Sequence, residues 1–400
     1  MGLQKRFSGR SLGPSIPDQI AAGPSSPVRG SQDQCRSEEN PMRSSSDIEV
    51  RKVAIGLVGA GLVGAALLDQ LRAQAAALSR YPLRLELCLV ALCTSRKQVL
   101  GSIQEPVSLT NWKERLDKGI MNDLLHFQQH LSHIATKHLT IVVDCTASSF
   151  VPGLYQRFLS SGVHVVAANK QLGAGKLSEY KAVLNCVSLP HSAPGLPGPT
   201  FRYEATVGAG LPIISTLQSL LLTGDTVHLI EGVFSGSLSF IFNSLGTTSF
   251  SQAVRDAQSR GYTEPDPRID LSGMDVARKA VILARECNLE LSLEDVSVES
   301  LVPQDMQQLK PAEFLEALHQ LDSGMSKRIH AAHKHKQVLR YVALLDVGQR
   351  QCKVALKEYD QGHAFGSLSG SDNVFAFHTQ RCMESELSAV ALQPTDLVTL

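Results

Sequence analysis

The chain has 400 residues, 43% of them hydrophobic and 19% charged, and its 38 basic and 38 acidic residues leave a formal net charge of zero. This balance gives no electrostatic reason to expect a nucleic acid or an anionic membrane as a partner. No apolar run reaches the roughly 18 residues that a membrane helix needs. The eight cysteines are scattered without a C-x-x-C pair. We therefore expect two to three domains and reduced thiols in an intracellular compartment.

The first fifty residues differ in composition from the rest of the chain. They are rich in Ser, Gly, Pro and Gln and lack hydrophobic periodicity, which predicts a disordered extension over residues 1–50. Their first thirty positions hold four basic residues against one acid, Asp18, a bias that resembles a transit peptide weakly. A plain disordered extension fits equally well. We expect a cytoplasmic location, with a plastid as the alternative.

Strands and helices alternate from Lys52 onward. The segment 52–78 reads as a β-branched strand, a glycine turn and a long Ala- and Leu-rich helix. Further buried strands are predicted over 83–95, 138–148 and 162–170, with helical stretches between them. This alternation predicts an α/β domain with a Rossmann-type parallel sheet.

Gly59, Gly61 and Gly64 form a G-x-G-x-x-G motif between the first strand and its helix. The first glycine permits a tight turn, the second lets a pyrophosphate approach the backbone, and the third allows close packing of helix on strand. The helix N-terminus then faces the anion. In this position the motif predicts a site for a dinucleotide, NAD or NADP.

The end of the second strand bears on the choice between the two dinucleotides. An acid there would bind the ribose 2′-hydroxyl of NAD, but the chain reads Thr94, Ser95, Arg96, Lys97. A cationic pair suits the 2′-phosphate of NADP. The alternative is that Arg96 and Lys97 begin a solvated helix, so we expect NADP or NAD, with NADP favoured.

The pattern changes after a predicted loop at 189–200. Residues 226–245 indicate a strand, a small-residue turn and a helix, and residues 249–262 indicate a helix that ends at Gly261. A helix over 272–288 has Ser272 as its candidate N-cap. Residues 337–360 read as two antiparallel strands. A second, α+β domain is therefore expected.

The segment 261–280 concentrates charge beside an apolar run. Asp275 and Lys279 are four residues apart, so they share one face of the predicted helix. As an exposed pair they would be commonplace. Because the helix continues as A-V-I-L-A, Lys279 is expected at the edge of the core, where its ammonium could stabilise and protonate an alkoxide that forms from a carbonyl. Glu264 and Asp270 could hold an ammonium group of a substrate.

At this point several collinear motifs resemble those of homoserine dehydrogenases. They are G-L-V-G-A-G-L-V-G at 56–64, A-N-K at 168–170, Y-E-A-T-V-G-A-G-L-P-I-I at 203–214, G-V-F-S-G-S-L-S-F-I-F-N at 232–243, G-Y-T-E-P-D-P-R-I-D-L-S-G-M-D-V-A-R-K at 261–279 and L-S-G-S-D-N-V-F-A-F at 368–377. The similarity runs from about Lys52 to Phe377 and resembles the fungal single-function type.

The resemblance implies interconversion of L-homoserine and L-aspartate 4-semialdehyde with NAD(P), on the route to threonine, isoleucine and methionine. The family's proton donor falls on Lys279. Its substrate-binding residues fall on Gly261, Glu264 and Asp275. With the glycine turn, the cofactor-binding residues are then Gly59, Ala60, Gly61, Leu62, Val63, Gly64, Arg96, Thr146 and Lys170.

A structural monovalent cation, usually sodium, is also implied by the resemblance. The loop that holds it corresponds here to Glu204, Val207, Ala209 and Leu211. Backbone carbonyl oxygens are chemically suitable ligands for such a hard ion. The family is usually a homodimer, paired through sheets of the second domain. The expected domains are 1–50 (extension), 51–200 (nucleotide-binding), 201–340 (catalysis and dimerisation) and 341–400 (strands, then a return toward the nucleotide-binding domain).

The chain departs from the family pattern at two places. Ile269 stands where members usually carry an acid in P-R-D-D-L, and no glycine follows Gly370, where the family has a glycine-rich turn near the nicotinamide. A catalytically impaired NAD(P)-binding homologue is therefore the alternative reading.

Two other readings concern different chemistry. Cys145, after a predicted strand, could be the nucleophile of a semialdehyde dehydrogenase that forms a thiol adduct, although a small buried residue is the simpler interpretation. His330, His333 and His335 could suggest a metal cluster, but their basic helical context favours a solvated face.

Overall fold

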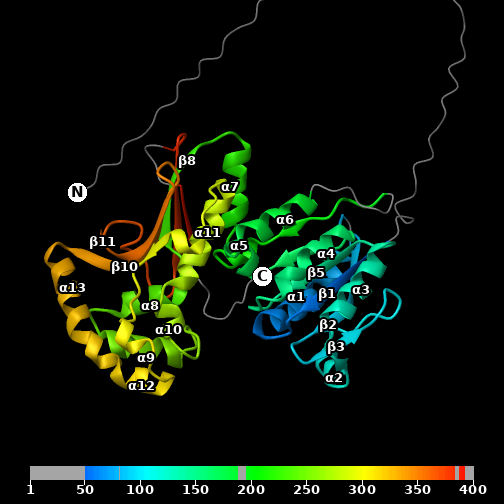
Figure 1. Cartoon of the computed structure of the whole chain (residues 1–400), viewed down its shortest axis with the longest axis horizontal. Helices are drawn as coiled ribbons and strands as arrows, with labels where there is room; N and C mark the ends of the chain where they lie inside the picture. Colours follow the sequence, from blue (N-terminus) through cyan, green and yellow to red (C-terminus); the bar gives the residue numbers. More distant parts are fainter. Residues whose placement is uncertain (1–49, 81, 188–194, 383–386, 392–400) are drawn as a thin grey trace, which may run out of the picture. The chain divides into compact units, whose positions relative to one another are not determined.

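The computed structural model describes residues 50–80, 82–187, 195–382 and 387–391, the last range for its backbone only. All of these residues belong to one compact unit, which contains two β-sheets (Figure 1). Residues 1–49 of the predicted disordered extension and residues 189–194 of the predicted loop 189–200 lie outside the described residues.

The first sheet has the strand order β4-β3-β2-β1-β5-β6-β7. Its strands β2, β1, β5, β6 and β7 run parallel, while β3 is antiparallel to both β2 and β4. The order reverses between β1 and β5, which is where open α/β sheets bind ligands. The strands are β1 (Arg51–Val58), β2 (Leu85–Cys93), β3 (Lys97–Leu100), β4 (Ile120–Met121), β5 (Thr140–Asp144), β6 (His164–Ala167) and β7 (Phe201–Arg202).

Helices cover both faces of this sheet because β1 is apolar on both sides. Val53, Ile55 and Leu57 pack with Leu68 of α1, whereas Ala54 and Val58 join the cluster of α3 and α4 on the other face. The helices of this part are α1 (Leu62–Leu78), α2 (Trp112–Asp117), α3 (Leu124–Ala135), α4 (Tyr155–Ser160), α5 (Gln171–Ala174) and α6 (Leu177–Val187), with a 3₁₀ turn η1 (Val151–Leu154).

The second sheet has the order β13-β12-β8-β10-β11-β9. Its neighbours are antiparallel, except that β9 runs parallel to β11. Its strands are β8 (Val227–Val233), β9 (Val296–Val298), β10 (Gln337–Asp346), β11 (Gln351–Asp360), β12 (Asn373–Thr379) and β13 (Leu387–Ala391).

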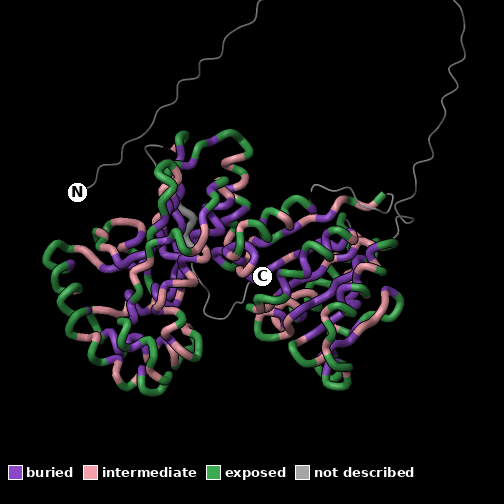
Figure 2. Tube along the Cα trace, viewed as in Figure 1, coloured by how far each residue is buried: buried purple, intermediate pink, exposed green. Residues whose placement is uncertain are grey.

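One helix, α11, is central to this second part. Eight of its residues are buried, among them the run from Ala280 to Arg285, and Figure 2 shows the buried trace in this region. It packs on β10 and β11 and also contacts α5 and α7. The helices are α7 (Ile213–Leu222), α8 (Gly236–Ser244), α9 (Phe250–Ser259), α10 (Arg268–Leu271), α11 (Met274–Glu286), α12 (Pro311–Ala317) and α13 (Asp322–Lys334); the 3₁₀ turns are η2 (Glu204–Thr206), η3 (Leu293–Asp295), η4 (Gln304–Met306) and η5 (Leu318–Leu321).

Comparison with the sequence predictions confirms the Rossmann-type sheet, the second sheet and the hairpin at 337–360. The alternative in which Arg96 and Lys97 begin a helix is wrong, because Lys97 starts β3, which folds back antiparallel on β2. Within the parts of the chain that the structure describes, no helix combines the length and apolar character needed to cross a bilayer.

Candidate active site

The glycine turn connects β1, which ends at Val58, to α1, which begins at Leu62. Gly59 has a φ of 92°, in the region that favours glycine, and its N–H donates to the Cys93 carbonyl at 2.9 Å. A Cβ on Gly64 would lie 2.1 Å from the Gly59 carbonyl oxygen. The backbone packing of the turn therefore requires glycine at both positions.

Gly61 has a different environment. A Cβ at this position would meet no described heavy atom within 4 Å. The N-terminus of α1 carries no side-chain cap and no acid in its first turn, and Leu62 beside it is 87% exposed. The first N–H groups of α1 are thus available to an anion, and the open space at Gly61 suits a phosphate that lies against the turn.

The two cations at the end of β2 differ in their contacts. The ammonium of Lys97 donates to the Asp117 carbonyl. Arg96 is exposed, and within the described residues its guanidinium makes no hydrogen bond or ion pair. Of the predicted cationic pair, Arg96 is therefore the member without a protein acceptor.

A buried polar network lies at the end of β5, below the glycine turn. The fully buried Asp144 carboxylate accepts hydrogen bonds from Tyr155 Oη at 2.6 Å, Asn169 Nδ2 at 3.0 Å and the Thr146 N–H at 2.8 Å. Burial raises the pKa of Asp144, although these hydrogen bonds oppose the shift. A Cβ on Gly59 would lie 2.6 Å from Thr146 Cγ2. The network thus fixes Thr146 against the turn.

The charged cluster predicted from sequence forms around Asp275. Its carboxylate lies 2.9 Å from Lys279 Nζ and 3.4 Å from Lys170 Nζ. Lys279 Nζ also donates to the Phe234 carbonyl at 2.7 Å, and its side chain is only 15% exposed. Burial opposes ionisation of Asp275, but the two ammonium groups outweigh it and hold its pKa well below the usual range. The structure therefore joins α11, the A-N-K turn and the β8–α8 loop at one point.

An ion pair alone would raise the pKa of a lysine, but the pKa of Lys170 is lowered. Burial lowers the pKa of Lys170, and the positive charges of Lys279 and Arg278 lower it further, against the attraction of Asp275. A carboxylate or phosphate that approached this point would relieve the repulsion among the three cations.

The remaining predicted acids are Glu264, in the loop before α10, and Asp270, within α10. Gly261 has a φ of 74° at the end of α9. The Glu264 N–H donates to Asp270 Oδ2 at 2.9 Å, and Ser237 Oγ donates to Asp270 Oδ1 at 2.8 Å. Burial raises the pKa of Asp270. Among the described residues, the exposed Glu264 carboxylate makes no hydrogen bond or ion pair with Asp275 or Lys279.

The prediction of Ser272 as the N-cap of α11 is wrong by one residue. Gly273 occupies that position with a φ of 74°, and Ser272 Oγ accepts a hydrogen bond from the Met274 N–H at 3.2 Å. A Cβ on Gly273 would lie 2.0 Å from Tyr341 Oη, so the close approach of β10 selects glycine here.

Arg285 connects α11 to α5, the short helix that begins directly after Lys170 in the chain. Its guanidinium is buried and donates to the carbonyls of Gly173 at 2.7 Å and Gly175 at 2.6 Å, and it lies over the Tyr180 ring at 5.3 Å. A Cβ on Gly173 would come within 2.9 Å of Ile282. The sequence did not predict this junction, because hydrogen bonds from an arginine side chain to backbone carbonyls leave no recognisable sequence pattern.

The loop predicted to hold a cation is built around Glu204. Both oxygens of its carboxylate accept hydrogen bonds from the N-terminus of α7, from Ile214 at 2.7 Å and Ser215 at 2.9 Å. Gly208 and Ala209 follow with positive φ, and the Leu211 carbonyl accepts from the Ile213 N–H. In the described part of the chain, the carbonyls of Val207 and Ala209 accept no backbone hydrogen bond, so their oxygens fit a cation chemically.

Cys145 and the three histidines are the basis of the thiol-adduct and metal-cluster alternatives. Burial raises the pKa of Cys145 to about 12, and the nearby Asp144 acts in the same direction. A thiolate nucleophile is therefore disfavoured there. His330, His333 and His335 are exposed, on α13 or just after it.

The described end of the chain belongs to the second sheet. β13 pairs antiparallel with β12, with Ala389 opposite Phe375. The expected return of the final segment toward the nucleotide-binding sheet concerns residues 392–400, which lie outside the described residues.

Comparison with known proteins gives consistent matches over both sheets. The family model described as homoserine dehydrogenase matches residues 212–391, and the model described as homoserine dehydrogenase, NAD binding domain, matches residues 59–186.

Among curated relatives, the homoserine dehydrogenase of Saccharomyces cerevisiae is 36% identical over 344 residues, which cover 84% of this chain and 91% of that protein. The chloroplastic bifunctional aspartokinase/homoserine dehydrogenase 1 of Arabidopsis thaliana is 42% identical over 340 residues, but these cover 36% of that protein. The chain thus spans about a third of the plant relatives and most of the yeast one.

Solved structures agree on the fold. A Candida auris protein described as of unknown function matches with a TM-score of 0.75 and 36% identity, over 85% of this chain and 93% of that one. A hyperthermophilic archaeal homoserine dehydrogenase in complex with NADPH matches with a TM-score of 0.60 and 19% identity, over 85% and 91% of the two chains, a likeness of fold alone.

Proposed function

Because this chain belongs to the homoserine dehydrogenase family, we propose that it interconverts L-homoserine and L-aspartate 4-semialdehyde with NAD(P), on the route to threonine, isoleucine and methionine. The observation that carries the proposal is the meeting of Lys279, Asp275 and Lys170 at one point. Those residues come from a helix of the second part and a turn of the nucleotide-binding sheet.

Lys279 is proposed as the proton donor to the carbonyl oxygen of the semialdehyde. Two of its three N–H groups have acceptors, Asp275 and the Phe234 carbonyl, so one remains to face a substrate oxygen. In the reverse direction the same nitrogen accepts the hydroxyl proton of homoserine. Its small exposed fraction limits competition by water.

The acids of the α9–α11 segment are proposed to hold the amino-acid head. Asp270 is braced by Ser237 and by the Glu264 N–H, so its charge is presented in a fixed position to an ammonium group. Glu264 and Asp275 are proposed as the other acids of this substrate site. Gly261, with its positive φ, turns the chain from α9 into the loop that carries Glu264. Lys170 would face the substrate carboxylate and attract it.

For the dinucleotide, we propose that Gly59, Ala60, Gly61, Leu62, Val63 and Gly64 form the pyrophosphate cradle, with Thr146 and Lys170 nearer the reacting end. When bound, the reduced nicotinamide supplies the hydride for carbonyl reduction. Arg96 is proposed to favour NADP, since it is the free cation beside the strand end where the 2′-phosphate belongs.

A monovalent cation, sodium by family resemblance, is proposed at Glu204, Val207, Ala209 and Leu211. The two carbonyls without backbone donors support it. Comparing thermal unfolding in sodium chloride with that in a bulky-cation salt of equal ionic strength tests it. Equal midpoints would contradict a resident ion.

A homodimer paired through the second sheet is also proposed. One face of that sheet carries the half-buried Leu229 and Leu344, together with the hydrogen-bonded side chains of Glu231 and His378 (3.1 Å). Such a face suits a self-complementary interface. Light scattering should give twice the chain mass, and less after Leu344→Glu. For the compartment, the word chloroplastic in the plant relatives' names supports a plastid as the alternative to the cytoplasm.

The impaired-homologue alternative rests on Ile269 and on the absence of glycine after Gly370. Neither the family matches nor the described residues support it.

The deciding experiment follows absorbance of reduced nicotinamide with the full chain, homoserine and either NAD or NADP. Lys279→Met should lower turnover by about 10²–10⁴-fold and leave dinucleotide affinity unchanged. Lys310→Met is the matched control, since the Lys310 side chain is 84% exposed. No reduction with homoserine, or equal turnover in the two variants, would refute the assignment.

A further inference from the structure

A separate pocket of about 630 Å³ lies beside α10 and the first turns of α11. The segment that follows β9 forms its other wall. The lining residues are Asp266, Arg268, Ile269, Ser272, Met274, Arg278, Val298, Ser300, Val302 and Gln307.

This pocket is distinct from the reaction site because it uses other faces of the same helices. Asp275 and Lys279 share one face of α11, whereas Met274 and Arg278 share the face about 100° away. On α10, Ile269 lines the pocket, while Asp270 turns to Ser237 and the Glu264 N–H. The two sites therefore use different faces of the helices, although Arg278 is close enough to Lys170 to lower its pKa.

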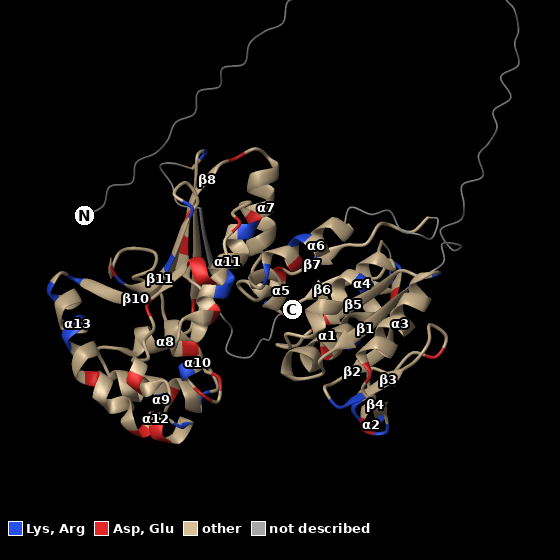
Figure 3. Ribbon diagram, in the orientation of Figure 1, with Lys and Arg blue, Asp and Glu red and all other residues tan. Residues whose placement is uncertain are grey.

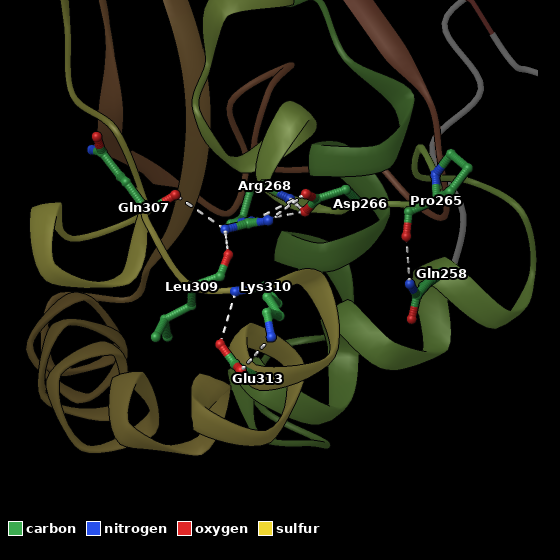
Figure 4. Close-up of polar contacts among 8 residues, drawn as sticks. All are labelled: Gln258, Pro265, Asp266, Arg268, Gln307, Leu309, Lys310 and Glu313. Carbon is green, nitrogen blue, oxygen red and sulfur yellow. Dashed lines mark hydrogen bonds and ion pairs between the residues drawn. The ribbon is translucent and has the colours of Figure 1, made fainter.

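The two arginines of the pocket differ in how they are satisfied. Figure 4 shows Arg268 paired with Asp266 at 2.6 Å and donating to the Gln307 and Leu309 carbonyls. Its charge is compensated within the protein. Arg278 is half-buried, and among the described residues its guanidinium makes no hydrogen bond or ion pair with a carboxylate or a carbonyl. Figure 3 marks basic positions in blue on the ribbon near α10 and α11.

The remaining walls are largely apolar. Met274, Val298 and Val302 line the pocket, and Ile269 is 54% exposed at its edge. The Ser272 and Ser300 hydroxyls already donate to the Ile269 and Val302 carbonyls. An acid at position 269, as in the P-R-D-D-L pattern, would repel an anion from Arg278; isoleucine removes that repulsion and adds apolar surface.

We propose that this pocket binds a small organic anion with an apolar body, such as a branched short-chain carboxylate. Its carboxylate pairs with the Arg278 guanidinium, and its alkyl group packs on Ile269, Met274 and Val302. Bidentate pairing with a carboxylate is the geometry that a free guanidinium favours. This inference does not rest on the proposed function, because the binding requires no turnover.

Titration calorimetry of the full chain with 3-methylbutanoate tests the proposal. We expect a Kd on the order of 1 mM, as suits so small a ligand. The neutral 3-methylbutanamide and the short acetate should each bind at least about tenfold more weakly, because the first lacks the charge and the second lacks the apolar body.

Two variants locate the binding. Arg278→Met should weaken 3-methylbutanoate about tenfold or more, and Arg278→Lys should restore part of the affinity. Ile269→Asp, at an exposed position that does not endanger folding, should abolish binding by repulsion. Arg202→Met, an exposed arginine of β7, is the control and should change nothing.

Three results would overturn the proposal. The first is no heat of binding up to about 10 mM carboxylate. The second is an affinity unaffected by both Arg278→Met and Ile269→Asp. The third is an affinity that survives those changes but falls in Lys279→Met, which would place the anion at the reaction site instead.

Discussion

The N-termini of α1 and α11 both contribute to the proposed site, but through different kinds of groups. At α1 the contribution is backbone: three glycines, an uncapped helix end and open space at Gly61. At α11 it is side chains, with Asp275 held between two ammonium groups and a glycine buried against Tyr341. Backbone sites are specified by local sequence, whereas side-chain sites depend on partners brought in by the fold.

The comparison implies that Gly64 tolerates substitution least. In Gly64→Ala the new Cβ would stand 2.1 Å from the Gly59 carbonyl oxygen, so backbone must move. We expect a loss of about 3 kcal/mol in the free energy of unfolding together with loss of dinucleotide binding. Urea denaturation and dinucleotide titration measure both. Wild-type stability would show that helix and turn do not pack this closely.

The side-chain cluster at the N-terminus of α11 should be sensitive to a change at Arg285, near the other end of the same helix. In Arg285→Met the carbonyls of Gly173 and Gly175 lose their buried donor, at about 2 kcal/mol. Because α5 follows Lys170, we expect kcat to fall more than dinucleotide affinity does. Steady-state kinetics and urea denaturation check this. Arg285→Lys should recover part of kcat, and a stability loss without any kinetic change would leave Arg285 a purely structural residue.

These contrasts explain which features could be predicted from the sequence. The glycine turn and the spacing of Asp275 and Lys279 are local patterns, so they were predicted correctly. The contact of Lys170 with Asp275 follows only from the fold, although the family resemblance marked Lys170. The Asp144 network and the Arg285 junction have no local signature, since their partners are a tyrosine hydroxyl, an amide and carbonyls from distant segments. The β2–β3 hairpin was missed because a turn and a helix start have similar polar composition.

The pH dependence of substrate binding sharpens the comparison further. Burial raises the pKa of Asp270, so this carboxylate is protonated at a higher pH than an ordinary one. Its attraction for a substrate ammonium is complete above that pKa and is lost as the pH falls through it. The KM for homoserine should therefore rise on acidification before ordinary carboxylates titrate.

Asp270→Asn should give a KM raised about tenfold that no longer depends on pH in this range. Asp266→Asn is the control, because Asp266 lines the separate pocket and pairs with Arg268, which lowers its pKa. A pH profile of KM that is the same in wild type and Asp270→Asn would remove Asp270 from substrate binding.

The smallest effect is expected at Gly61, where it separates function from folding at the α1 end. Gly61 has a φ of −76°, which alanine adopts without strain, and a Cβ there meets no described atom. Gly61→Ala should leave the free energy of unfolding unchanged or raise it by up to about 0.5 kcal/mol, because alanine restricts the unfolded chain. The added methyl would nevertheless occupy the space proposed for the pyrophosphate, so dinucleotide affinity should fall about fivefold, near 1 kcal/mol. Opposite signs for stability and binding would mark the turn as a cradle for a ligand. Unchanged dinucleotide affinity would mean that the pyrophosphate lies elsewhere, and the glycine at this position would then have no explanation in packing or in binding.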